Sequence, residues 1–112
     1  MKLDSLPGVS GKLLALDRDT KAHAYLVKYE PSTDFPRHKH PCLEHVYILE
    51  GEVEVEGQRH GPGTHFIFPA GQEHGPFKNE SLLTELVVFE GISGLEEAVP
   101  EIKTLFEEMG IL

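Results

Sequence analysis

A chain of 112 residues with 39% hydrophobic content can bury one substantial core, so we expect a single domain spanning residues 1–112. Its net charge of −9 disfavours binding to nucleic acid or to anionic membranes, because phosphate groups require basic partners. The single cysteine excludes an internal disulfide, and neither a secretion signal nor a membrane-spanning apolar run is evident. We therefore expect a cytoplasmic protein.

The N-terminal part of the chain predicts an arm followed by two strands. Residues 1–12 are interrupted by Gly and Pro, which favours an extended arm. A short strand is predicted over 13–16, and a turn follows. Residues 22–29 alternate in character, with aromatic and β-branched side chains on one face, which is typical of a strand.

The middle of the chain predicts further strands. Residues 44–56 alternate around Gly51, so we expect a hairpin with a solvated face of glutamates. Apolar strands are predicted over 64–68 and 82–89. Many short strands separated by Gly and Pro turns indicate an all-β sandwich or small barrel, with its core over residues 20–90.

The C-terminal part differs, because residues 95–110 predict a short α-helix. Pro100 suits the first helical position, and Gly110 suits the cap. Apolar residues follow Pro100 at helical spacing, namely Ile102, Leu105, Phe106 and Met109. This amphipathic stripe is expected to pack on the barrel or on a partner subunit.

Two fixed spacings carry the chemistry. The first is His38-x-His40-x3-Glu44-x6-Gly51, and the second is Gly63-x5-Pro69-x-Gly71-x2-His74. Prolines on both sides of the His38–His40 segment argue against a helix, and an extended backbone places both imidazoles on one side. If the two segments are neighbouring strands, His38, His40, Glu44 and His74 converge on one point.

Three imidazoles and one carboxylate are a mixed nitrogen and oxygen ligand set. Such a set suits Mn, Fe, Co, Ni, Cu or Zn better than Ca or Mg, which prefer oxygen alone. Four protein ligands leave two open positions on an octahedral metal, where water, substrate or dioxygen would bind. With a divalent ion the site would carry a charge of about +1, which favours an anionic or enolate-like ligand.

These two motifs closely resemble those of the cupin superfamily, over roughly residues 20–90. Two positions depart from the family pattern: Ser32 stands where the first motif opens with glycine, and Lys78 replaces the final asparagine of the second, with Asn79 adjacent. The short segment between the motifs resembles small single-domain bacterial cupins. The resemblance implies a cupin-type jelly-roll barrel, or double-stranded β-helix. It also implies one divalent transition metal on His38, His40, Glu44 and His74, and a homodimer.

Other chemically capable residues lack motif spacing. His23, His45, His60 and His65 are expected to serve packing or surface roles, although any of them could support a metal ligand by a hydrogen bond. Cys42 lies between two of the proposed ligands and could be a fifth ligand or a reactive thiol, but a small buried side chain in the kink is the simpler interpretation.

The fold does not choose the chemistry. Cupins with this ligand set include dioxygenases, decarboxylases and isomerases, and also non-catalytic binding and sensor domains. We expect a metal-dependent, dioxygenase-like enzyme acting on a small organic substrate. The alternative is a non-catalytic small-molecule-binding, metal-binding or sensor cupin. Epimerase-type cupins resemble this chain less, because their site relies on a His/Tyr pair.

Overall fold

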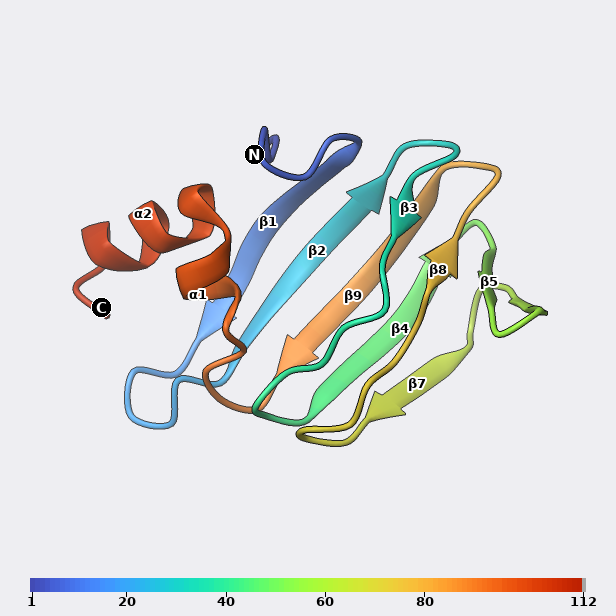
Figure 1. Ribbon diagram of the computed structural model, residues 1–112. Coiled ribbons are helices and arrows are strands. Elements are labelled where there is room, and N and C mark those ends of the chain that lie inside the picture. The colour runs from blue at the N-terminus through green and yellow to red at the C-terminus, as the bar shows by residue number, and fades with distance from the viewer. Residues whose placement is uncertain (112) are drawn as a thin grey trace.

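The computed structural model describes residues 1–111 as two antiparallel sheets followed by two short helices (Figure 1). The larger sheet has the order β1-β2-β9-β4-β7 and the smaller one β3-β8-β5-β6. The strands are β1 Val9–Leu16, β2 His23–Tyr29, β3 Asp34–Phe35, β4 Glu44–Glu50, β5 Val53–Val55, β6 Gln58–His60, β7 His65–Phe68, β8 Phe77–Lys78 and β9 Leu83–Phe89. The helices are α1 Leu95–Ala98 and α2 Pro100–Glu108. The predicted all-β class is confirmed.

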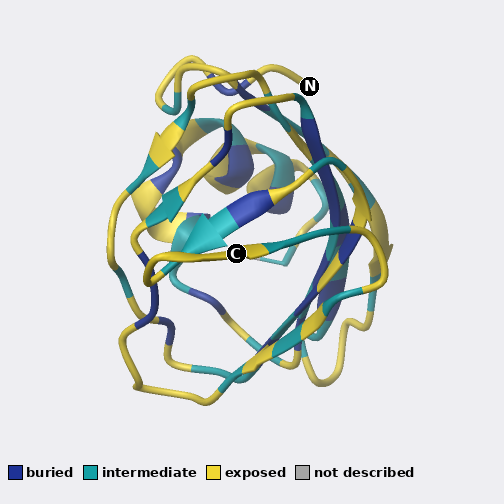
Figure 2. Ribbon diagram, turned by 90° about the vertical axis from the view of Figure 1, so that its right-hand side faces the viewer, coloured by how far each residue is buried: buried dark blue, intermediate teal, exposed yellow. Residues whose placement is uncertain are grey.

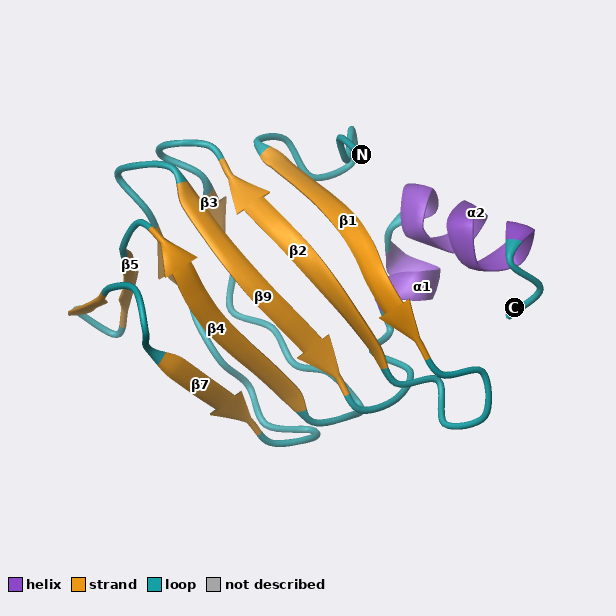
Figure 3. Ribbon diagram, turned by 180° about the vertical axis from the view of Figure 1, so that it is seen from behind, coloured by secondary structure: helices purple, strands orange, loops and turns teal. Residues whose placement is uncertain are grey.

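The core lies on the inner face of the larger sheet. Strand β9 pairs with β2 on one side and with β4 on the other, so it occupies the middle of that sheet (Figure 3). Side chains of a strand alternate between faces, so one face can be apolar while the other meets solvent. The longest buried stretches in Figure 2 accordingly follow this sheet. The main core cluster contains Leu3, Val9, Tyr25, Val46, Val87, Phe89, Val99, Ile102 and Phe106.

The predicted hairpin over residues 44–56 is wrong. Strand β4 pairs with β7 and β9 in the larger sheet, whereas β5 pairs with β6 and β8 in the smaller one. Gly51 therefore carries the chain from one sheet to the other. The alternation of Val53 and Val55 correctly indicated a strand, but alternation identifies a face and not a pairing partner.

The N-terminal segment is more regular than predicted. Strand β1 begins at Val9, four residues before the expected start, and pairs with β2 as far as Leu16. Leu3 is buried against the core, and its backbone N–H donates to the carbonyl of Val9 at 3.1 Å. Residues 1–12 are therefore a folded loop and the first half of a strand, not an extended arm.

The single helix predicted over 95–110 is replaced by two helices with a break at Val99. The φ of −109° and ψ of 107° at Val99 are extended, as expected for a residue that precedes proline. Ile102 and Phe106 are buried in the main core cluster, so the apolar stripe of α2 packs on this chain's own sheet. The homodimer stays a prediction. No helix within residues 1–111 is long and apolar enough to cross a membrane.

Candidate metal centre

Backbone pairing brings the two motifs together. The N–H of His38 donates to the carbonyl of His74 at 3.0 Å, and the N–H of His74 donates back to His38 at 2.8 Å. This reciprocal pair is an isolated antiparallel bridge. The N–H of Gly71 also donates to the carbonyl of His40 at 2.7 Å. The predicted adjacency of the two segments is confirmed, although the contact is a bridge and not a long strand pair.

Glu44 completes the group from the larger sheet. It is the first residue of β4, where it pairs with Phe68 and Phe89. Its Oε1 lies 3.1 Å from His74 Nε2 and 3.7 Å from His40 Nε2. The Nε2 atoms of His38 and His74 are 3.1 Å apart. One donor atom from each of the four residues lies within 4.8 Å of the others, so the group could hold a metal ion.

Hydrogen bonds orient two of the imidazoles. His38 Nδ1 lies 2.7 Å from the carbonyl of Pro36, and His40 Nδ1 lies 2.8 Å from the carbonyl of Ser93. A carbonyl only accepts, so each Nδ1 carries the proton and each neutral ring presents a lone pair at Nε2. Burial lowers the pKa of His38, although its hydrogen bond to Pro36 opposes the shift. His74 differs, because its Nδ1 is buried without a partner among the described residues.

The donor atoms are arranged around a shared point. Glu44 Oε1 is buried and has no hydrogen-bond partner among the described residues, even though His74 Nε2 is only 3.1 Å away. A buried carboxylate oxygen left unpaired costs free energy, and the lone pair at His38 Nε2 lies in the same small space, 3.1 Å from His74 Nε2. One cation among these atoms would satisfy both. The residues therefore fit the metal implied by the motifs.

Both departures from the motif pattern preserve the local geometry. Ser32 has a φ of +65°, the left-handed conformation that a glycine adopts easily, and its N–H donates to the carbonyl of Asn79 at 2.8 Å. Asn79 is buried, and its side-chain amide donates to the carbonyls of Tyr29, Glu30 and Ser81. The residue next to Lys78 thus joins the loop after β8 to the end of β2.

The remaining histidines and the cysteine lie outside the group of four. His45 faces away from Glu44, with its Nδ1 3.0 Å from His65 Nε2 and its Nε2 3.1 Å from Glu90 Oε1. Cys42 packs against the core cluster, and burial raises the pKa of its thiol. The expectation that these residues serve packing and surface roles agrees with these positions.

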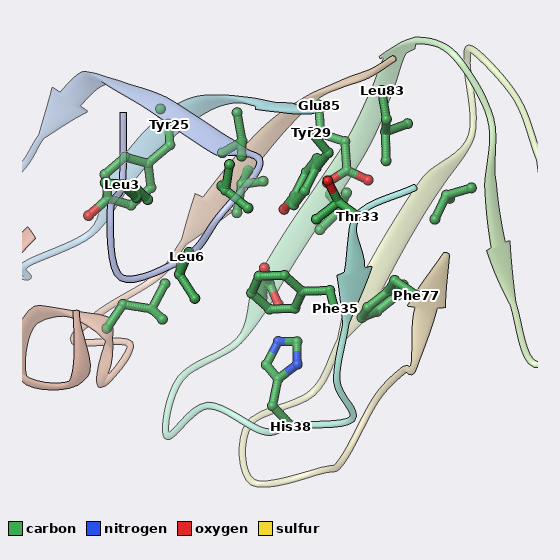
Figure 4. A pocket seen from close by; sticks show the side chains of 18 of the residues that line it. Leu3, Leu6, Tyr25, Tyr29, Thr33, Phe35, His38, Phe77, Leu83 and Glu85 are labelled. Carbon is green, nitrogen blue, oxygen red and sulfur yellow. The ribbon is translucent and has the colours of Figure 1, made fainter. Parts of the chain in front are cut away.

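An apolar pocket extends from the candidate metal centre (Figure 4). Its volume is about 100 Å³, and its walls include Tyr29, Phe35 and Phe77 as well as the four candidate ligands. Glu85 also lines it, on the inner face of β9, and sequence reasoning assigned this residue no role. Burial, followed by repulsion from Glu44, raises the pKa of Glu85 to about 7.

A third buried carboxylate, Glu96, stabilises the turn that hydrogen-bonds to His40. Glu96 is fully buried and accepts hydrogen bonds from the N–H and hydroxyl of Ser93 and from the N–H of Gly94. His23 Nε2 lies 3.3 Å from Glu96 Oε1. These contacts hold the turn whose Ser93 carbonyl accepts from His40. The Ser-x-x-Glu spacing is that of a helix capping box, a signal that could have identified this pair.

Glu96 gives an expected pH dependence of stability. Burial alone would raise its pKa, but hydrogen bonds from His23 and Ser93 outweigh burial and lower it to about 2. A lowered pKa means that Glu96 contributes stability above about pH 4.5, and that this contribution is lost as the pH falls toward 2. In Glu96→Gln, we expect lower stability at pH 7 and a smaller loss of stability between pH 4.5 and 2, measured by urea unfolding. A constant difference between the two proteins over that range would contradict the assignment.

The sequence comparisons identify relatives of this chain. Residues 2–91 match the family described as "ChrR Cupin-like domain". The dimethylsulfoniopropionate lyase DddQ of Ruegeria pomeroyi is 36% identical over 73 residues, which is 61% of this chain and 36% of the lyase. The chain therefore spans little more than a third of that relative.

Solved structures share the architecture. The crystal structure of DddQ from Ruegeria pomeroyi superposes with a TM-score of 0.63 and 27% identity, covering 81% of this chain and 51% of the lyase. An acetylacetone dioxygenase from Acinetobacter johnsonii gives a TM-score of 0.66 at 18% identity, covering 75% of this chain and 60% of the dioxygenase. A cupin protein of Ralstonia eutropha gives a TM-score of 0.66 at 18% identity, covering 76% and 57% of the two chains. The predicted cupin-type fold is confirmed.

Proposed function

Because this chain belongs to the ChrR cupin-like domain family, we propose that it binds one divalent transition metal and uses it to transform a small organic molecule. His38, His40, Glu44 and His74 would be the ligands. The observation that carries this proposal is the convergence of their four donor atoms at the wall of an apolar pocket. A purely structural metal site is usually closed, whereas this one adjoins a space that a ligand could enter.

The donor set is compatible with Mn, Fe, Co, Ni, Cu or Zn. When bound, such an ion acts as a Lewis acid, and the redox-active members also support chemistry with dioxygen. The chain's own contribution is to hold the ligands in position. The carbonyls of Pro36 and Ser93 fix the protons of His38 and His40 on Nδ1, and the apolar walls limit the access of water.

We favour a dioxygenase-like reaction, because open coordination positions beside a small pocket are what a substrate and dioxygen require. A lyase-type elimination is a second candidate, and the 36% identity to a lyase over 73 residues favours it. Tyr29 and Glu85 line the same pocket and are available to hold a proton. The non-catalytic alternative is a binding or sensor module with the same metal and pocket.

Turnover by metal-loaded protein separates these possibilities. Small carbonyl, enol and thiol compounds and dimethylsulfoniopropionate would be supplied with and without dioxygen, and products would be followed by mass spectrometry. Oxygen consumption coupled to substrate loss is expected for a dioxygenase, and product formation without oxygen for a lyase. Full metal occupancy with tight ligand binding and no turnover would support the non-catalytic module instead.

Metal affinity should depend on pH in a defined direction. Imidazole must be neutral to bind a metal, and an ordinary histidine has a pKa of about 6.5. Because burial lowers the pKa of His38, this residue should stay neutral at lower pH than an exposed histidine. We expect affinity to be constant near pH 8 and to fall steeply below about pH 6, measured by competition with a chelator of known pH dependence. Affinity that is unchanged from pH 8 to about 4.5 would contradict ligation by three histidines.

A further inference from the structure

Glu85 is a carboxylate on a face that is otherwise apolar. Strand β9 directs Leu83, Glu85, Val87 and Phe89 to the same side, and all four are buried and line the pocket. Glu85 pairs across the sheet with Val27 and Ile48, so it occupies the centre of the larger sheet and not its edge. Buried glutamates are rare unless they are paired, because an ionised carboxylate is costly to remove from water.

Among the described residues, the basic side chains that line the pocket are the three histidines of the candidate metal centre. Among residues 1–111, no Lys or Arg lines the pocket. The side-chain partner of Glu85 is the hydroxyl of Tyr29, and Figure 4 shows the two side chains together at the end of the pocket away from His38. Glu44 is the other carboxylate of the pocket, and it belongs to the candidate metal centre. The pocket thus has one acidic end beside aromatic walls and one metal-binding end.

We propose that Glu85 and Tyr29 form a subsite for an alkylated cationic group of the ligand, such as a trimethylammonium or dimethylsulfonium group. A carboxylate and an aromatic ring attract a cation together, and aromatic walls are a common means of recognising quaternary ammonium groups. A bare ammonium fits less well, because it carries three N–H donors and the apolar walls offer few acceptors. Methyl groups instead match the apolar surface.

The two ends of the pocket then define a ligand class. The metal end, which rests on the proposed function, would carry a charge of about +1 and favour a carboxylate or enolate. The Glu85 end favours a positive charge. The ligand is therefore a small zwitterion with an acidic group and an alkylated onium group, short enough for a cavity of about 100 Å³.

Pairs of isosteric acids test this inference directly. The probes would be trimethylammonio acids with chains of two, three and four carbons. Each would be compared with the neutral-headed acid in which a carbon atom replaces the quaternary nitrogen; for glycine betaine this isostere is 3,3-dimethylbutanoate. Binding to cobalt-loaded protein would be measured by calorimetry at pH 8, where Glu85 is largely ionised. We expect wild type to prefer the onium acid of the best-fitting length by about tenfold or more.

Glu85→Gln keeps the shape of the side chain and removes its charge. It should abolish the preference for the onium acid while leaving the metal content and the affinity for the carbon isostere nearly unchanged. Glu50→Gln removes one charge from an exposed position of β4 and should keep the preference. Equal affinity of wild type for both acids, or no binding of either by cobalt-loaded protein, would overturn the inference. Failure of wild type to bind cobalt would overturn the proposed metal site first.

Discussion

The variant His74→Ala is expected to weaken metal binding by at least about 100-fold. Loss of a residue that only supports a metal ligand costs about 10–100-fold in affinity, so loss of a ligand should cost at least as much. His74 Nε2 lies 3.1 Å from both Glu44 Oε1 and His38 Nε2, which places it centrally among the donors. Affinity would be measured by competition with a chelator after removal and reloading of the metal.

His45→Ala is the matched control for this variant. His45 contacts His65 and Glu90 on the outer side of the sheet and is not among the four donors. It should bind metal as wild type does, and circular dichroism should show that both variants are folded. Equal affinity of His74→Ala and wild type, or an equal loss in His45→Ala, would contradict the assigned ligand set.

The variant Gly51→Ala is expected to lose about 3 kcal/mol or more of the free energy of unfolding. Gly51 has a φ of +87°, and a Cβ there would lie 2.1 Å from the carbonyl oxygen of Leu82. The obstacle is backbone, so no side chain can rotate away. Since 1 kcal/mol shifts the Tm of a domain of about 100 residues by roughly 4–8 °C, thermal melting should show a decrease of more than about 10 °C.

Two other glycines serve as controls that distinguish the cost of the steric clash from the cost of the left-handed backbone conformation. Gly57 and Gly63 have φ values of +81° and +92°, yet a Cβ at either would have no atom within 4 Å. Alanine at these positions should cost only about 1–2 kcal/mol, the penalty of the left-handed conformation. If all three variants lost equal stability, the close approach of Gly51 to Leu82 would not explain the motif glycine at that position.

The convergence of the four donors was predictable from spacing. In an extended backbone, residues two apart share a side, which unites His38 and His40, and a turn rich in Pro and Gly returns His74 to the same place. The bridge between His38 and His74 depends on the whole barrel, so the sequence could only suggest it. Strand β9 lies nearly 40 positions beyond β4 in the chain, and its pairing with β4 was not predicted. Local alternation carries no information on which strand is the partner.

The supporting residues were missed for a different reason. Glu85 lies on the inner face of a strand that was correctly predicted to be apolar. A charged residue on the same face as Leu83, Val87 and Phe89 was the feature of the sequence that could have indicated a special role. Sequence analysis assigned Glu96 no role, and its burial against Ser93 and His23 depends on tertiary packing. Sequence patterns predicted the convergence of the four candidate donors but not the residues that support them, because the supports act through contacts between distant elements.

Elemental analysis of untagged protein tests the central claim most directly, with wild type compared with the double variant His40→Ala/His74→Ala. We expect wild type to contain close to one equivalent of a single transition metal, and the folded double variant to contain almost none. A redox-active metal would favour oxygen chemistry, whereas zinc would be compatible with elimination. Absence of metal from wild type even after reloading, or equal metal in both proteins, would contradict the proposed site.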